Sequence, residues 1–281
     1  MLIDTHCHLD AAEFGMDQAA LVMAANSAGV GRIVIPSVER ANFAAVHTLC
    51  EQYPCCSPAY GIHPMYTDGA TPEDINALRD YLREHQPVAV GEIGLDFFIE
   101  NYHQARQEHF FLEQLKLARE FELPVLLHIR RAQDTVLKYL RKFYGSGGLA
   151  STSSGHASTK LRTGPSTSLR TGIIHAFSGS RQQADEFIKL GFKLGFGGAT
   201  TYPRAARLHE LLRTLPIDSI VLETDAPDMP PAFLARGEPN KPEYLPRIAR
   251  IIAELRGISP EALARVTTEN ALSVLNLPRP L

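Results

Sequence analysis

Eight short apolar runs recur along this 281-residue chain and alternate with segments of helical periodicity. The runs cover residues 1–3, 32–35, 57–62, 88–92, 124–128, 173–175, 192–196 and 219–223. Strands that alternate with helices form parallel sheets, because each helix returns the chain to the edge where the next strand starts. Eight such units favour a closed (β/α)8 barrel of the TIM type. An open doubly wound sheet would more often carry a glycine-rich dinucleotide turn after its first strand.

One stretch interrupts this alternation. Between about 145 and 171 the chain contains almost only Gly, Ser, Thr, Pro, Arg and Lys with a few Leu, and it holds a direct repeat, STKLRTG followed by STSLRTG. A segment with so few apolar residues has little to bury, so we expect a low-complexity, disordered insertion within a single barrel domain spanning residues 1–281. The tail, residues 246–256 and 259–275, is expected to form helices that close the barrel.

The charge balance and the cysteines exclude several classes of protein. With 28 Lys and Arg against 31 Asp and Glu, the formal net charge is −3, which argues against tight nonspecific binding of duplex DNA. The four cysteines show no C-x-x-C spacing, so we expect reduced thiols in a cytoplasmic protein. No apolar run reaches membrane-spanning length, and no basic region followed by an apolar core opens the chain, so we expect no membrane contact.

Side chains that bind metals recur where the apolar runs end. His6 and His8, in the opening DTHCHLD, lie two residues apart, and in an extended strand such residues project to the same side. A histidine pair alone is equally compatible with two polar residues at a strand end. The full set of strand-end candidates is larger and comprises His6, His8, Glu92, His128, His175 and Asp225. Since a parallel barrel presents the carboxyl ends of its strands at one face, these side chains are predicted to form a metal centre there.

Eight short motifs resemble, in order, those of the TatD family of metal-dependent hydrolases: DTHCHLD, GIHP, GEIGLD, LPVLLHIRRA, IIHAFSG, ETDAPDMP, EPNKPE and TEN. TYPRA and ETDAPDMP are most similar to the YjjV-like branch of that family. The resemblance runs from residue 3 to about residue 277 and is interrupted only by the insertion. It implies a (β/α)8 barrel whose one- or two-metal centre hydrolyses phosphodiester bonds in DNA, often from a 3′ end.

The resemblance also implies a role for each ligand. The roles are His6, His8 and Asp225 for a first divalent ion, His128 and His175 for a second, and Glu92 as the bridge between them. Two cations about 3.5–4 Å apart stabilise the attacking and leaving oxygens of an in-line displacement and lower the pKa of a bound water. The ions would be Mg, Mn or Zn. Glu92 and Asp225 would be the catalytic residues, with Asp225 either accepting a proton from the water or acting only as a ligand.

Three residues near the strand ends are candidates for substrate binding. His63, in GIHP, matches a family motif residue and would contact a substrate phosphate, although it also fits a hydrogen-bonded structural histidine. Arg130 lies two residues past His128, on the same side, where its guanidinium would clamp a phosphate. Arg204 is the third candidate, against the alternative that an arginine starting a helix meets only solvent. Asp4 is expected to orient a histidine ligand.

The expected function is a metal-dependent deoxyribonuclease, a 3′–5′ exonuclease on single-stranded DNA. Its expected partner is nucleic acid as substrate, DNA before RNA, with no obligate protein partner. An ester or amide hydrolase on the same scaffold is the alternative, because some TatD-like proteins resemble D-aminoacyl-tRNA deacylases. Glu92 argues against the cyclic-amide enzymes of the wider superfamily, which commonly place a carbamylated lysine at that strand end. A non-catalytic metal-binding scaffold is a third reading, against which the six intact ligands argue.

Overall fold

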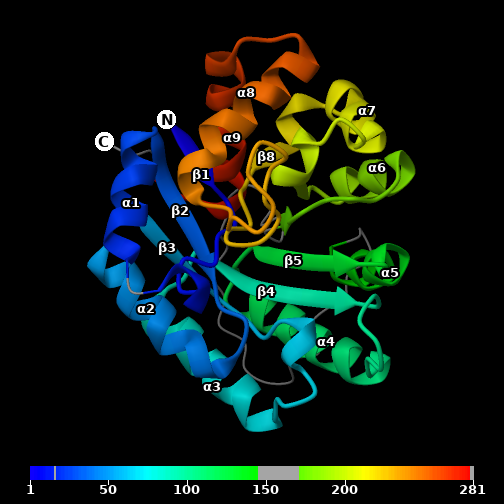
Figure 1. The fold of residues 1–281 in the computed structure, drawn as a ribbon. Coiled ribbons are helices and arrows are strands. Elements are labelled where there is room, and N and C mark those ends of the chain that lie inside the picture. Colours follow the sequence, from blue (N-terminus) through cyan, green and yellow to red (C-terminus); the bar gives the residue numbers. More distant parts are fainter. Residues whose placement is uncertain (16, 145–170, 279–281) are drawn as a thin grey trace, which may run out of the picture.

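The computed structural model describes residues 1–15, 17–144 and 171–278. Within these residues, eight strands follow one another in chain order from β1 to β8, and helices surround them on the outside (Figure 1). Every neighbouring pair from β1–β2 to β7–β8 is parallel. This is a (β/α)8 barrel, so the fold predicted from the alternating apolar runs is confirmed.

The elements lie close to the predicted ranges. The strands are β1 (Leu2–Asp4), β2 (Val30–Pro36), β3 (Cys56–Tyr60), β4 (Ala89–Asp96), β5 (Val125–Arg130), β6 (Gly172–Ile174), β7 (Lys193–Phe196) and β8 (Ile220–Leu222). The helices are α1 (Gln18–Ser27), α2 (Phe43–Gln52), α3 (Pro72–His85), α4 (Gln104–Glu120), α5 (Gln133–Tyr144), α6 (Arg181–Lys189), α7 (Ala206–Thr214), α8 (Leu245–Arg256) and α9 (Pro260–Leu275). Local signals set some of these bounds: α3 begins with a proline in its first turn, after a capping box between Thr71 and Asp74.

The first and last strands close the ring through residues just past their ends. The N–H of Thr5 donates to the carbonyl oxygen of Leu222 at 3.0 Å. The Asp4 carboxylate accepts from the backbone N–H of Thr224 at 2.9 Å, from its hydroxyl at 2.6 Å, and from the backbone N–H of His6 at 3.3 Å. Asp4 therefore clamps the two ends of the barrel together. Asp4 reaches His6 through its backbone N–H, so the expected support of a histidine ligand acts on the backbone of His6.

Strand β4 is longer than the sequence predicts, and the expectation that Glu92 ends its strand is wrong. Pairing with β5 continues to Asp96, and the register between the two strands shifts beside Glu92. Gly94 has a φ of 147°, and a Cβ at this position would overlap the carbonyl oxygen of His128 on β5. Glycine therefore lets the two strands stay close past the irregularity, so that Glu92 points into the barrel from within the strand.

Two apolar layers hold the barrel together. One lies between the strands and the surrounding helices. The other lies on the inner face, where seven of the described strands each contribute one side chain that packs with α9: Ile3, Val34, Ala59, Ala89, Leu126, Ile173 and Val221. Helix α9 covers the amino-terminal end of the barrel, because Thr268 Oγ1 donates to the Met1 carbonyl at 3.0 Å and Asn270 Nδ2 donates to the Ile220 carbonyl at 2.8 Å. The predicted closing role of the tail helices is thereby confirmed for α9.

The predicted insertion falls almost entirely on residues 145–170, which lie outside the described part of the chain. It connects α5 to β6, as the order of the apolar runs predicts. Its disorder and the single-domain organisation remain predictions. No described helix is both long and apolar enough to cross a membrane.

Candidate metal centre

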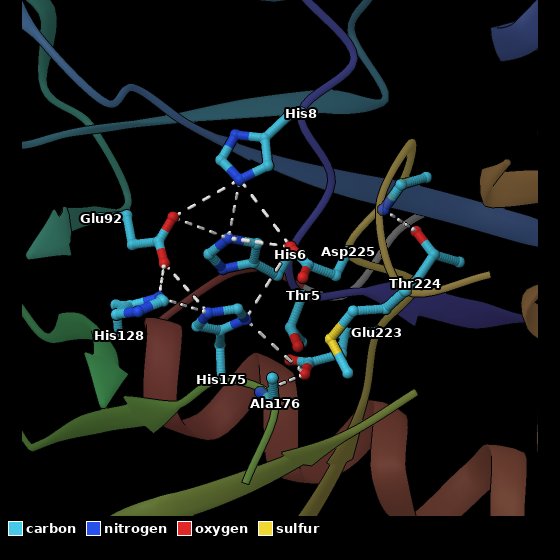
Figure 2. Close-up of polar contacts among 12 residues, drawn as sticks. Thr5, His6, His8, Glu92, His128, His175, Ala176, Glu223, Thr224 and Asp225 are labelled. Atoms are coloured by element: carbon cyan, nitrogen blue, oxygen red, sulfur yellow. Dashed lines mark hydrogen bonds and ion pairs between the residues drawn. The ribbon is translucent and has the colours of Figure 1, made fainter. Parts of the chain in front are cut away.

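All six predicted ligands lie close together at the carboxyl-terminal end of the barrel (Figure 2). They come from β1, β4, β5, β6 and β8 or from the residues that follow these strands. The six are His6, His8, Glu92, His128, His175 and Asp225. Glu92 lies between the others, and its two carboxylate oxygens face different neighbours. Each of the two oxygens therefore has its own set of neighbouring donor atoms.

Three ligands gather on the side of Glu92 Oε2. His6 Nε2 lies 3.2 Å and His8 Nε2 3.4 Å from this oxygen, and the two nitrogens are 3.3 Å apart. Asp225 Oδ1 lies 3.7 Å from His6 Nε2 and 3.8 Å from His8 Nε2. Asp225 has a φ of 58°, a left-handed conformation that non-glycine residues adopt rarely and often at functional sites. The histidine pair therefore converges with a carboxylate, as its spacing along the chain predicts.

Two histidines gather on the side of Glu92 Oε1. His128 Nδ1 and His175 Nε2 each lie 3.0 Å from this oxygen, and the two nitrogens are 3.3 Å apart. The Glu92 carboxylate thus separates two sets of donor atoms and contributes one oxygen to each (Figure 2). This is the arrangement that a carboxylate bridging two cations requires.

The spacing of these atoms fits divalent metal ions. Bonds of about 2.0–2.1 Å from a tetrahedral metal to nitrogen place neighbouring ligand atoms roughly 3.3 Å apart. The separations around Glu92 Oε2 are 3.2, 3.3 and 3.4 Å, and those around Oε1 are 3.0, 3.0 and 3.3 Å. The Nδ1 atoms of His6 and His175 are buried without a hydrogen-bond partner, and their Nε2 atoms face Glu92 Oε2 and Oε1 respectively. The residues therefore fit one or two divalent ions.

The centre is buried around an ionised carboxylate. Burial alone would raise the pKa of Glu92, but the imidazoles of His63, His6 and His175 hold it well below its usual range. Burial lowers the pKa of His6 to about 3, which keeps this ring neutral with a lone pair free for a metal. A fixed negative charge among imidazole nitrogens is an environment that attracts a cation.

Two other histidines have raised pKa values because they lie beside this charge. Burial lowers the pKa of His8, but its hydrogen bond to Glu92 and the charge of that carboxylate outweigh burial and raise the pKa to about 9. Burial also opposes the charge of Glu92 at His175, whose pKa rises to about 10. The charge of Glu92 therefore favours protons on both of these rings. Metal binding should release them, because only a neutral imidazole donates a lone pair.

Two buried carboxylates that sequence reasoning missed lie behind the ligands, and one of them, Asp96, contacts a ligand ring at hydrogen-bond distance. Asp96 Oδ2 lies 3.0 Å from His128 Nε2, a contact that leaves Nδ1 of the same ring free to face Glu92. Glu223 Oε1 lies 3.9 Å from His175 Nδ1. The signal for Asp96 was the strand period of two, which puts Glu92 and Asp96, four residues apart on β4, on the same side. Because β4 was predicted to end at Glu92, the period of two was not extended to Asp96.

The structure brings two of the three predicted substrate-binding residues to the centre. His63 Nε2 lies 3.5 Å from Glu92 Oε1. Arg130, the exposed last residue of β5, lines the same cleft, which has a volume of about 780 Å³. Arg204 is absent from the described residues that line this cleft, and its guanidinium lies 5.4 Å from the ring centre of Tyr202. The geometry therefore separates Arg204 from the other candidates.

Comparisons with known proteins point to one family. The family model described as TatD related DNase matches residues 3–276. A protein of Escherichia coli (strain K12) named uncharacterized metal-dependent hydrolase YjjV is 38% identical over 278 residues, which cover 98% of each chain. The crystal structure of YjjV, described as a TatD homolog, has a TM-score of 0.87 to this structure over 99% of this chain and 98% of that chain. The 3′-5′ ssDNA/RNA exonuclease TatD of Erwinia billingiae is 30% identical over 283 residues, 99% of this chain and 100% of that protein.

The family match and the site agree in extent and in chemistry. The matched residues 3–276 include every ligand of the centre, from His6 to Asp225. The resemblance to the YjjV-like branch is confirmed by the similarity to YjjV in sequence and structure. The chain therefore belongs to the TatD family of metal-dependent hydrolases.

Proposed function

We propose that this protein hydrolyses phosphodiester bonds in DNA as a 3′–5′ exonuclease on single strands. The observation that carries the proposal is the position of Glu92, which offers one oxygen to each of two donor sets. A pair of cations shared in this way suits in-line displacement at phosphorus. The name of the Erwinia billingiae relative, 3′-5′ ssDNA/RNA exonuclease, supports both the substrate class and the polarity.

The chain itself supplies a base for the attacking water. When bound, one or two divalent ions, Mg, Mn or Zn, would stabilise charge on the phosphate oxygens and lower the pKa of water. Asp225 Oδ1 lies 3.7 Å from His6 Nε2 and 3.8 Å from His8 Nε2, so its carboxylate is within the same set of donor atoms. Burial raises the pKa of Asp225, which makes its carboxylate a stronger base than one at the surface. Asp225 would therefore take the proton that the water loses.

His63 is placed to donate a hydrogen bond to the substrate. Its Nδ1 accepts from the backbone N–H of Met65 at 3.2 Å, so the neutral ring carries its proton on Nε2. Burial lowers the pKa of His63 to about 4, so the ring is neutral at physiological pH. Its Nε2 faces the cleft beside Glu92. An N–H at this point suits a phosphate oxygen, whereas a metal ligand would need a lone pair there.

A D-aminoacyl ester is the second candidate substrate, because one feature of the cleft favours it. Asp10, Glu13 and Asp228 line the cleft together with the ligands. Carboxylates there would attract an ammonium group, which an aminoacyl ester carries and a nucleic-acid strand lacks. The same activated water would attack a carbonyl carbon in place of phosphorus.

A turnover screen distinguishes the two candidates. Chelated protein should be supplied in turn with Mg, Mn and Zn and offered single-stranded DNA labelled at its 5′ end, the same strand as RNA, and D-aminoacyl-tRNA. We expect 5′-labelled DNA to shorten stepwise, and chelator to abolish the reaction, because the site has no substitute for the cations. Intact DNA with deacylated tRNA would transfer the function to the ester candidate. Elemental analysis of the active protein would give the number of ions.

Arg130 and Arg204 offer a matched pair of arginines for testing the cleft. Arg130→Ala should raise KM for an oligonucleotide about tenfold or more, because a charge-assisted contact to phosphate is lost. Its effect on a small activated phosphodiester without flanking phosphates should be much smaller. Arg204→Ala should leave both substrates within about twofold of wild type, because this exposed side chain contacts the Tyr202 ring and does not line the cleft. Equal losses for the two variants would contradict the assignment of the cleft.

A cytoplasmic location, the lack of an obligate protein partner and the preference for DNA over RNA are part of the same proposal. The four cysteines without C-x-x-C spacing support the location, since a reducing compartment keeps such thiols free. Cell fractionation with an antibody against the native chain would test it.

A further inference from the structure

A second hollow of about 440 Å³ opens beside the metal cleft and shares Arg130 and Ser178 with it. Its wall comes from the loops that follow β4, β5 and β6 and from the first turn of α7. In a (β/α)8 barrel these loops lie on the same face as the metal centre. The hollow is therefore a continuation of the cleft along the β4–β6 side of the ring.

Three arginines line this hollow: Arg130, Arg131 and Arg207. Among the described residues, none of the three forms an ion pair with a carboxylate, whereas arginines on the neighbouring helices α5 and α6 do so at 2.8 and 2.9 Å. The nearby Asp134 is occupied by Gln183 Nε2, which donates to it at 3.0 Å. Asp96, paired with Arg130 across β4 and β5, is the nearest carboxylate that interacts with this group, and its charge is shared with His128. Three guanidinium groups that form no ion pair around one hollow favour a ligand with negative charge.

Phe98 holds two of these arginines in place. Its ring, which is 44% exposed, has the guanidinium carbon of Arg130 at 3.6 Å and that of Arg131 at 4.5 Å from its centre. Stacking on an aromatic face leaves the N–H groups of a guanidinium free along its edge. The phenyl ring therefore positions the arginines while their donors remain available, which lowers the entropy lost when an anion binds.

The charges of the metal cleft differ around the ring. Arg130, at the end of β5, is the one arginine or lysine among its described lining residues. The carboxylates that do not belong to the centre, Asp10, Glu13 and Asp228, follow β1 and β8. Because β1 and β8 are neighbours in the ring and lie across from β4 and β5, one side of the cleft is acidic and the other continues into the arginine hollow. The acidic side opposes a polyanion that leaves the centre, and the side with the arginines favours it.

We propose that the hollow lined by Arg130, Arg131 and Arg207 binds the phosphates of the nucleotides next to the cleaved bond, on the side that remains attached to the strand. This inference rests on the proposed nuclease function and deepens it. The strand runs over the β4–β6 side, its last phosphodiester lies at the metal centre, and its terminal nucleoside, which brings no further phosphate, lies toward the acidic β8–β1 side. The charge distribution thereby selects strand ends over internal bonds, because an internal bond would force a phosphate against Asp10, Glu13 and Asp228.

The test compares substrates that reach the hollow with one that does not. Arg207→Gln and Arg131→Gln should be assayed on a twelve-nucleotide single strand and on a dinucleotide, whose one phosphodiester occupies the metal centre alone. We expect KM for the long strand to rise about tenfold for each variant and KM for the dinucleotide to stay within about twofold. The dependence of log KM on log salt for the long strand should also become shallower by about 0.7, the share of one lost contact to a single strand. Arg213→Gln, an exposed arginine on the same helix α7, is the matched control and should change neither substrate.

Equal changes on both substrates, or an unchanged long-strand KM, would overturn the inference. Binding of a labelled twelve-nucleotide strand to the chelated protein, followed by fluorescence anisotropy, separates it from the proposed function. If wild type cleaves neither substrate but binds the strand in a manner that Arg207→Gln weakens, the hollow is supported and the nuclease proposal fails. Absence of strand binding by wild type would overturn the hollow as a nucleic-acid site.

Phe98 has its own pair of variants because it acts through the arginines. Phe98→Leu should reproduce the rise in KM for the long strand with an unchanged dinucleotide KM, and Phe98→Tyr should restore wild-type behaviour because it keeps the aromatic face. A merely structural role would lower the melting temperature and affect both substrates alike, and it would contradict this positioning role.

Discussion

Along the inner face of the barrel, two layers of side chains differ in chemistry. The lower layer is the apolar cluster packed against α9 at the amino-terminal end of the strands, and the upper layer is the cluster of ionisable groups around Glu92 at their carboxyl-terminal end. Leu126 and Ile173 belong to the lower layer, fully buried against α9. Two residues further along the same strands, and therefore on the same face, His128 and His175 belong to the upper layer around Glu92. A shift of two residues thus exchanges close apolar packing for a cluster of ionisable groups.

The lower layer stabilises the fold, and the upper layer holds the candidate functional site. The lower layer gains free energy with every apolar group removed from water. The upper layer loses it, since the buried Nδ1 atoms of His6 and His175 and Glu223 Oε2 have no hydrogen-bond partner. The strands and the residues that directly follow them hold both layers, so the packing of the lower layer sustains the unfavourable arrangement of the upper layer. Variants in each layer should therefore change different measurements.

The largest expected effect is in the upper layer. Glu92→Gln should lower kcat/KM at least about a thousandfold, because two cations held by one charged bridge contribute several kcal/mol to the transition state. Metal content per chain should fall, while circular dichroism should show a folded protein. Near-normal activity with near-normal metal content would contradict the bridging role of Glu92 and the assignment of function to the upper layer.

The matching change in the lower layer is Leu126→Ala. It should lower the free energy of unfolding by about 2–5 kcal/mol, through lost burial and the cavity left against α9. Urea denaturation gives this value, and kcat/KM of the folded protein should stay within about twofold of wild type. A variant of unchanged stability that has lost activity would show that the layers are not independent.

Asp96 connects the upper layer to the strand that carries it. Asp96→Ala should weaken binding of one metal ion by about 10–100-fold, because His128 loses the partner that orients its ring. Competition with a chromophoric chelator measures this affinity. Asp96→Asn keeps an oxygen acceptor and serves as the control, with a smaller expected loss. If the alanine variant binds metal as wild type does, the contact is only structural.

The smallest expected effect comes from a conservative change in the lower layer. Ile173→Val removes one methylene from the lower layer and should cost about 0.5–1.5 kcal/mol of unfolding free energy. Metal content and turnover should not change, although His175 lies only two residues away on the same face. A loss of metal from this variant would mean that the packing below sets the ligand positions above.

The sequence predicted the barrel and the convergence of the six candidate ligands because both depend on local pattern. Apolar runs of period two followed by His, Glu or Asp remain visible in one dimension, as at His128 and His175. It did not predict that β4 continues past Glu92, because Gly94 normally argues against a strand interior and its close approach to β5 depends on the partner strand. The clamp formed by Asp4 was equally hidden, since its partner Thr224 is 220 residues away.

For the substrate-binding candidates the sequence was less informative. It placed Arg130 and Arg204 at comparable positions after strand ends, and only the structure shows that Arg130 lines the cleft while Arg204 does not. A helix or loop can turn a side chain toward the centre or away from it with little change in sequence. The role of each remains a prediction that the paired alanine variants test.

The clamp between Asp4 and Thr224 joins the beginning of the chain to a point near its end. During synthesis the residues around His6 and His8 leave the ribosome first, and Asp225 follows more than two hundred residues later. A chain that stops early contains the histidine pair but lacks both the clamp and the third donor of that set. The donors proposed for the first cation are therefore complete only after translation has passed residue 225, so loading of that site would depend on the last strand of the barrel.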